Sequence, residues 1–149
     1  MSAAPDQVSI ETLEAIMKAF NAHDLDAIME FFADDCTFDT SAGPEPYGAR
    51  LAGKAAVREG LAARFTAIPD VRYDADRHWI SGHLAVSEWL VHGTTTDGTQ
   101  IRARGVDHWE FRDEKIVRKD SYWKIVTPPR ARPGRRPAAT ALEGSGRPS

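Results

Sequence analysis

The chain has 149 residues, of which 42% are hydrophobic and 28% charged, and this composition suits one soluble domain with a sizeable core. No apolar run approaches the ~20 residues that span a bilayer, and the start of the chain lacks the basic and apolar regions of a signal peptide, so we expect a cytoplasmic protein without a membrane partner. The net charge is −3, and because residues 127–149 hold five arginines against one glutamate, residues 1–126 are acidic, which argues against a nucleic-acid partner.

The first part of the chain has the pattern of three helices. An N-cap serine followed by apolar residues at helical spacing predicts a helix over residues 9–22. Asp24 can cap a second helix, and a third is expected over residues 54–65. Residues 36–40 indicate a short strand. Cys36 is the only cysteine, so it excludes an intramolecular disulfide, and we interpret it as an ordinary core residue.

From residue 71 onward the pattern changes to strands. They are expected over residues 72–81, 84–96, 101–112 and 115–126, with a hairpin turn at Asp97-Gly98. Three helices followed by a four-stranded antiparallel meander make an α+β domain over residues 1–126. We expect the sheet to curve around the helices and to enclose a pocket. Residues 127–149, rich in Pro, Gly, Ala and Arg, are predicted to be a disordered tail.

Asp107 is the first candidate functional residue. Alternation along the strand 101–112 places it on a face that is otherwise apolar, beside Trp109. A carboxyl group there loses hydration without an obvious partner, so we expect it to be protonated and able to donate a hydrogen bond. The alternative is a buried structural acid that is bonded to a backbone amide or to a neighbouring arginine.

Three stretches of the sequence, AHDLDAIMEFFADDCTFDTSAG, VDHWEF and EKIVRKDSYW, resemble the nuclear transport factor 2-like superfamily. Within it they are most similar to the branch of ketosteroid isomerases and SnoaL-like polyketide cyclases. The resemblance covers residues 8–126 and implies a cone-shaped, cystatin-like roll with a pocket. Because this superfamily contains isomerases, cyclases, dehydratases, epoxide hydrolases and non-catalytic binders, it implies a fold rather than one reaction.

The resemblance also implies roles for individual residues. The oxyanion-hole aspartate of the isomerases, a carboxylic acid kept neutral by its apolar site, falls on Asp107. Their catalytic tyrosine falls on Ile16, and their general base falls on Thr40. Asp39, one residue earlier, would replace that base if a bulge turned it inward. The pocket tryptophan of the last strand corresponds to Trp123.

The same alignment places Glu88, Leu90 and His92 on the pocket face of the strand 84–96, and Lys119 at the pocket mouth. His92 is an acid–base candidate because imidazole titrates near neutral pH, although the other face of its strand is also apolar and would leave His92 exposed. The expected substrate-binding residues are Ile16, Phe20, Thr40, Glu88, Leu90, Trp109, Lys119 and Trp123.

We therefore expect a cofactor-free isomerase, cyclase or dehydratase that acts on an apolar, ketone-bearing molecule such as a polyketide or steroid-like ring. Asp107 would stabilise an enolate while His92 or Asp39 moves the proton. No metal is expected, because the sequence has no His-x-His, His-Glu-x-x-His or cysteine cluster. The alternatives are a non-catalytic module that binds a small ligand, and an epoxide hydrolase that uses Asp120. A homodimer through the outer face of the sheet is also expected.

Overall fold

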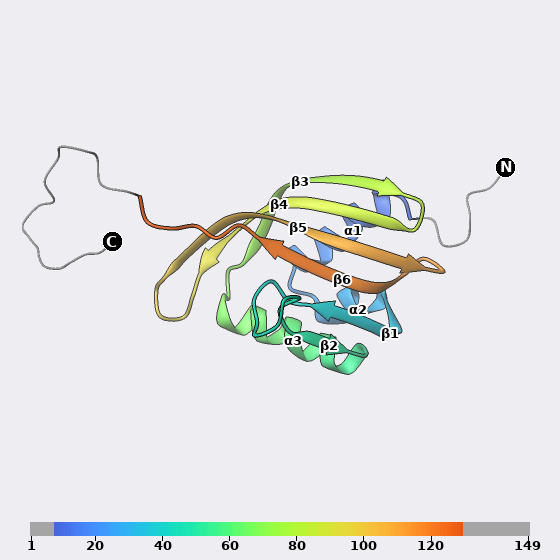
Figure 1. Ribbon diagram of the computed structural model, residues 1–149, viewed down its shortest axis with the longest axis horizontal. Helices are drawn as coiled ribbons and strands as arrows, with labels where there is room; N and C mark the ends of the chain where they lie inside the picture. Colours follow the sequence, from blue (N-terminus) through green and yellow to red (C-terminus); the bar gives the residue numbers. More distant parts are fainter. Residues whose placement is uncertain (1–7, 130–149) are drawn as a thin grey trace, which may run out of the picture.

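The computed structural model describes residues 8–129, which form three helices and six strands. The sheet curves around the helices, which lie on one of its faces (Figure 1). The elements in chain order are α1 (Ile10–Asn21), α2 (Leu25–Glu30), β1 (Phe32–Asp39), β2 (Arg50–Ala52), α3 (Lys54–Ala67), β3 (Arg72–Ser81), β4 (Leu84–Thr94), β5 (Gln100–Arg112) and β6 (Lys115–Trp123). The expected α+β class with a curved sheet is confirmed.

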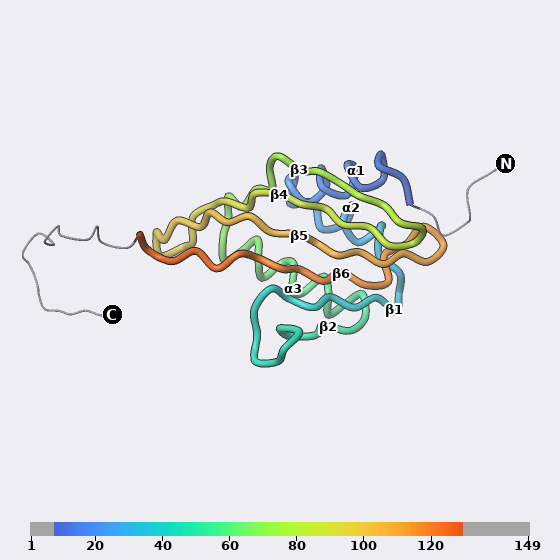
Figure 2. Tube along the Cα trace, turned by 45° about the horizontal axis from the view of Figure 1, so that its top comes forward, coloured from blue at the N-terminus to red at the C-terminus, as the bar shows by residue number. Residues whose placement is uncertain are grey.

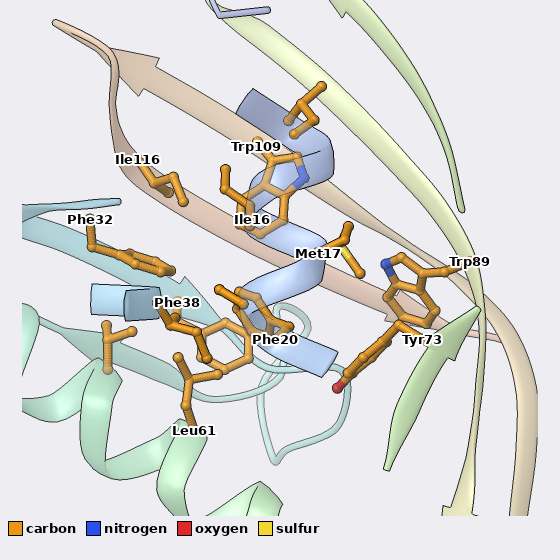
Figure 3. Close-up of a cluster of buried hydrophobic side chains, with 14 of the residues drawn as sticks. Ile16, Met17, Phe20, Phe32, Phe38, Leu61, Tyr73, Trp89, Trp109 and Ile116 are labelled. Carbon is orange, nitrogen blue, oxygen red and sulfur yellow. The ribbon is translucent and has the colours of Figure 1, made fainter. Parts of the chain in front are cut away.

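The first two helices begin at the capping residues that the sequence indicated. The Oγ atom of Ser9 accepts a hydrogen bond from the backbone N–H of Thr12 at 3.1 Å, and Asp24 Oδ1 accepts one from the N–H of Ala27 at 3.1 Å. Apolar residues of α1 at helical spacing are buried against the sheet, among them Ile16 and Phe20 (Figure 3). These caps and this apolar face fix where α1 lies.

The strand order is β2-β1-β6-β5-β4-β3, so the sheet is wider and less uniform than expected. The meander from β3 to β6 is antiparallel, whereas β1 pairs in parallel with β6 and antiparallel with β2. The expected four-stranded antiparallel meander is confirmed, and β1 and β2 extend it to a mixed sheet of six strands. β2 has only three residues and gives no periodic signal, and the pairing of β1 with β6 joins distant parts of the chain (Figure 2). Of the predicted tail, residues 127–129 are exposed and without regular structure, and residues 130–149 lie outside the described residues.

The core lies between the helices and the concave face of the sheet. Figure 3 shows aromatic side chains from α1, β3, β4 and β5 gathered there, including Phe20, Tyr73, Trp89 and Trp109. Burying a side chain of this size contributes about 1.5–3 kcal/mol, so these residues carry much of the fold. Cys36 is fully buried, as expected for a core residue, and burial raises the pKa of its thiol. Within residues 8–129, no helix is long and apolar enough to cross a membrane.

Candidate active site

Lys119 on β6 and Asp107 on β5 form an ion pair inside the domain. The Nζ atom of Lys119 donates to Oδ1 of Asp107 at 2.6 Å, and the two side chains are only 6% and 4% exposed. Ser121 Oγ donates to the same oxygen at 2.5 Å, and Nε1 of Trp89 donates to Oδ2 at 3.0 Å. Lys119 also donates to Ser121 Oγ at 2.7 Å. Asp107 therefore faces inward as expected, but with three donors around it.

These partners show that the expectation of an Asp107 without a partner was wrong. All three contacts are donors, and one of them is an ammonium group, so together they stabilise the carboxylate. The strand register explains the pairing: Asp107 lies opposite Ser121, and Lys119 lies opposite Trp109, so the acid and the amine are diagonal neighbours on one face. The alignment with the family had placed Lys119 on the pocket face, at the mouth, and the register brings it instead to the buried Asp107.

Lys119 is surrounded by aromatic rings as well as by polar partners. Its Nζ atom lies 4.5 Å from the ring centroid of Phe38, 5.4 Å from that of Trp109 and 5.5 Å from that of Phe20. Burial lowers the pKa of Lys119, and the neighbouring Asp107 opposes part of that effect. The amine is thus held at one place and loses its proton more readily than an exposed lysine does.

A cavity of about 50 Å³ adjoins this pair. Since a water needs roughly 10–15 Å³ on this measure, the cavity holds a few waters or a ligand portion of a few non-hydrogen atoms. Half-buried Arg64 lies over the ring of half-buried Trp123, 4.6 Å from its centroid, and both residues of this Arg64–Trp123 stack line the cavity. The cavity is lined by Phe38, Thr40, Gly60, Leu61, Arg64, Tyr73, Trp89, Lys119, Ser121 and Trp123.

The polar groups on the cavity wall are mainly hydrogen-bond donors. Lys119 and Arg64 offer N–H groups and Tyr73 offers a hydroxyl, whereas the hydroxyl of Ser121 already donates to Asp107. Burial raises the pKa of the Tyr73 phenol, so this hydroxyl keeps its proton at neutral pH. Such a wall suits an oxygen that carries or develops negative charge. It is unsuited to a cationic ligand, because both charged groups on the wall are positive.

Some residues expected to bind substrate lie at the cavity and some lie beside it. Thr40, Lys119 and Trp123 line the cavity. Phe20 and Trp109 do not line it but contact the Nζ atom of Lys119 with their rings. Ile16 is fully buried in the core. Phe20 and Trp109 thus hold Lys119 in place, whereas Ile16 is a core residue.

The expected inward orientation of Glu88, Leu90 and His92 was wrong. On β4 the buried residues are Ala85, Ser87, Trp89 and Val91, so the three named residues face the outer side of the sheet. There His92 Nε2 lies 2.5 Å from Oδ2 of Asp74, and Glu88 pairs with Arg104. Both faces of β4 carry large apolar side chains, which is why alternation could not choose between them. His92 consequently has no access to Asp107.

Asp39 also faces the outer side, because no bulge turns it inward. Its two carboxylate oxygens accept from Nε and Nη2 of Arg50 at 2.7 and 2.9 Å, and this pairing holds the pKa of Asp39 below its usual range. Phe38 takes the inward place opposite Lys119. The irregularity in β1 falls before Thr37 and leaves this alternation intact. Asp39 therefore cannot act as the base of a site around Asp107.

Asp120 shares this outer face with Asp39. It accepts a hydrogen bond from Arg118 Nη2 at 2.8 Å and another from the hydroxyl of Tyr122 at 3.1 Å. Asp120 is therefore an ion-pair residue of the outer face of the sheet. Because it points away from the cavity, the structure gives no support to epoxide hydrolysis.

A second chain of polar contacts, which runs from buried Ser87 to exposed Asp76, was missed by the sequence reasoning. Nε1 of Trp109 donates to Ser87 Oγ at 2.9 Å, Nδ1 of His78 lies 2.8 Å from the same oxygen, and Nε2 of His78 lies 2.7 Å from Oδ2 of Asp76. The order of serine, histidine and aspartate resembles that of a hydrolase triad. However, Ser87 is fully buried and does not line the cavity, so this chain fixes Trp109 rather than meeting a substrate.

A curved sheet wrapped around helices, with a polar cavity on its concave side, is the architecture of the nuclear transport factor 2-like superfamily. Residues 13–119 match the model of the SnoaL-like domain, and the chain therefore belongs to that family. Among residues 8–129, no group of three or more His, Cys, Asp or Glu side chains is arranged to hold a metal ion.

Solved structures share this fold. A nuclear transport factor 2-like protein of unknown function from Mesorhizobium loti is 30% identical, with a TM-score of 0.64 over 77% of this chain and 89% of that one. A candidate polyketide cyclase from Xanthomonas campestris pv. campestris is 24% identical, with a TM-score of 0.68 over 76% and 88%. TerC, co-crystallised with polyporic acid, is 24% identical, with a TM-score of 0.65 over 81% and 92%. A comparison with curated proteins found no match.

Proposed function

We propose that the protein is a cofactor-free acid–base enzyme of the isomerase, cyclase or dehydratase type, which binds the carbonyl end of a small molecule against Lys119. The observation that carries this proposal is the buried Lys119–Asp107 ion pair on the edge of a cavity. Desolvation largely offsets the attraction within such a pair, so it contributes little net stability. Buried, perturbed charges beside a cavity are typical of functional sites. Membership of the SnoaL-like family supports the class of reaction.

The proposed roles follow from which groups border the cavity. Removing a proton next to a carbonyl group creates an enolate, whose oxygen carries the developing negative charge. Arg64 and the Tyr73 hydroxyl are donors on the wall that can stabilise this oxygen. Lys119 in its neutral form takes the proton, and Asp107 orients the amine through the 2.6 Å hydrogen bond. In this proposal Lys119 is the base, in place of His92 and Asp39, which were the bases expected from the sequence.

The size of the cavity limits which part of a substrate can enter it. About 50 Å³ admits a carbonyl group and the few atoms around it, but not a whole steroid-like ring. The rest of a larger substrate would extend past the Arg64–Trp123 stack. Two positive groups on the wall favour an acidic or enolised carbonyl compound. The co-crystallisation of TerC with polyporic acid supports a small acidic ligand for this fold.

The competing function is a module that binds such a ligand without turnover. The observation that favours it is the full set of donors on Asp107, because a purely structural ion pair would have the same contacts. The two functions share the ligand and differ in chemistry. Proton exchange at the ligand therefore separates them.

The test is deuterium exchange at the carbons next to the carbonyl of hydroxyacetone and cyclohexanone, followed by proton NMR in D₂O. The wild-type chain should accelerate exchange by about 10²–10⁴ over buffer, the range of general acid–base catalysis. Lys119→Arg, which keeps the positive charge but cannot act as a base, should abolish the acceleration. His92→Ala is the matched control and should match the wild type. Binding of either ketone without any acceleration would establish the binding module instead.

A further inference from the structure

We propose that Lys119 forms a reversible covalent imine with small aldehydes and ketones that enter the cavity. This inference rests on the proposed function and narrows its substrates to compounds with an unhindered carbonyl carbon. It also makes the chemistry covalent, because an imine draws electrons from the neighbouring carbon and eases the loss of its proton.

Lys119 is set apart from every other lysine of the chain by its surroundings. It is the only buried lysine, whereas Lys18, Lys115 and Lys124 are exposed and Lys54 is half-buried. Its Nζ atom lies beside the cavity, and aromatic rings cover its other sides. Desolvation of the amine is what activates a buried lysine as a nucleophile, and Asp107, in hydrogen-bond contact, is the group that can take its proton.

The first half of the reaction uses the contacts already described. Asp107 Oδ1, 2.6 Å from Nζ, takes a proton from the ammonium and leaves a neutral amine. The nitrogen attacks the carbonyl carbon, so a C–N bond forms and the carbonyl π bond breaks. A proton then moves from the nitrogen to the former carbonyl oxygen, and Ser121 Oγ, 2.7 Å from Nζ, is placed to relay it. The product of this half is a neutral carbinolamine.

The second half returns the proton held by Asp107. The nitrogen lone pair forms the C=N bond while the C–O bond breaks, and the leaving hydroxyl takes the proton from Asp107 and departs as water. In total, one carbonyl and one ammonium give one iminium and one water, so no oxidant, reductant or further reactant is needed. The iminium keeps a positive charge beside the Asp107 carboxylate, which replaces the original ion pair.

The test is reductive trapping of the full chain. The protein is incubated with hydroxyacetone or acetaldehyde and sodium cyanoborohydride, and peptide mass mapping then measures the adduct on each lysine. We expect Lys119 to be modified about tenfold or more faster than Lys115, its exposed neighbour on β6, because only Lys119 is desolvated. In the urea-unfolded protein, Lys119 and Lys115 should be modified at the same rate. Comparable labelling of the two lysines in the folded protein would overturn the proposal.

Two variants sharpen this result. Asp107→Asn should slow trapping at Lys119 while leaving Lys115 unchanged, because the amide cannot take the ammonium proton. His92→Ala, on the outer face, should not change either rate. Deuterium exchange without trapping would show that Lys119 is a base only, so the imine fails and the proposed function stands. Trapping at Lys119 without deuterium exchange would show that the imine forms but that the protein does not catalyse proton transfer, so the proposed function fails.

Discussion

Asp107 and Lys119 meet diagonally across β5 and β6, with Nζ of Lys119 reaching back 2.6 Å to the carboxylate that lies opposite Ser121. Both residues belong to strands whose alternation can be read from the sequence, but their contact depends on the register between the strands. Both side chains are buried. The pair is therefore the main electrostatic feature of the domain interior.

The pair predicts a strongly non-additive effect on stability. Lys119→Met should lower the free energy of unfolding by about 3–5 kcal/mol, because it leaves the Asp107 carboxylate buried and unpaired. The double variant Asp107→Leu with Lys119→Met should recover most of that loss, since it removes both desolvated charges. Urea unfolding of the wild type, both single variants and the double variant measures the coupling. Additive losses would mean that the two charges do not depend on each other.

On the opposite face of the sheet, Asp39 should make the free energy of unfolding depend on pH. Because the pKa of Asp39 is lowered by Arg50, its contribution is complete above the unfolded value of about 3.9 and is lost as the pH falls through the lower folded value. Asp39→Asn should therefore cost about 1–3 kcal/mol near neutral pH, with the difference from wild type shrinking towards zero at strongly acidic pH. Urea midpoints measured across this range check the trend. A difference that stays constant down to acid would show that Asp39 is not held by charge.

The sequence predicted the fold well where local signals are strong and poorly where pairing is distant. The capped helices α1 and α2 and the meander from β3 to β6 follow from caps, apolar spacing and turns. β2 and the parallel pairing of β1 with β6 depend on contacts that no local pattern contains.

The candidate site divides in the same way. Asp107, Lys119 and Trp123 were placed inward because their strands have one clearly apolar or aligned face. His92 was misplaced because both faces of β4 are apolar, and a shift of one residue moves a side chain to the other side. Asp39 was expected to point inward only if a bulge turned it, and the irregularity in β1 does not do so.

Removing Arg64 from the Arg64–Trp123 stack should shift the binding preference towards larger ketones. Arg64→Ala removes the guanidinium that lies 4.6 Å from the ring centroid of Trp123, and so enlarges the cavity that Arg64 lines. Acetophenone should gain affinity relative to hydroxyacetone, by about tenfold if one aromatic ring becomes partly buried. Calorimetric titration of both ketones measures the ratio. Arg58→Ala, which removes an exposed arginine of the same helix, is the control and should leave the ratio unchanged.

We propose, as the sequence suggested, that the outer face of the sheet pairs two copies of the chain. Tyr122 is 57% exposed on that face, its hydroxyl bonds the buried Asp120, and the buried Asp39 lies opposite Asp120 on the neighbouring strand. Sedimentation should show a dimer at micromolar concentration, and Tyr122→Glu should shift it to a monomer, because a new charge opposes burial. A wild-type monomer at that concentration would contradict this proposal.

The claim that a carbonyl ligand binds against Lys119 is tested most directly by NMR of lysine labelled with ¹³C at Cε. The chain has few lysines, Lys18, Lys54, Lys115, Lys119 and Lys124, so each signal can be assigned by a single Lys→Arg substitution. On titration with hydroxyacetone, the Lys119 signal should shift or be replaced by a new one in a saturable manner, while the other signals stay in place. Saturable binding of hydroxyacetone that leaves the Lys119 signal unmoved would contradict the account.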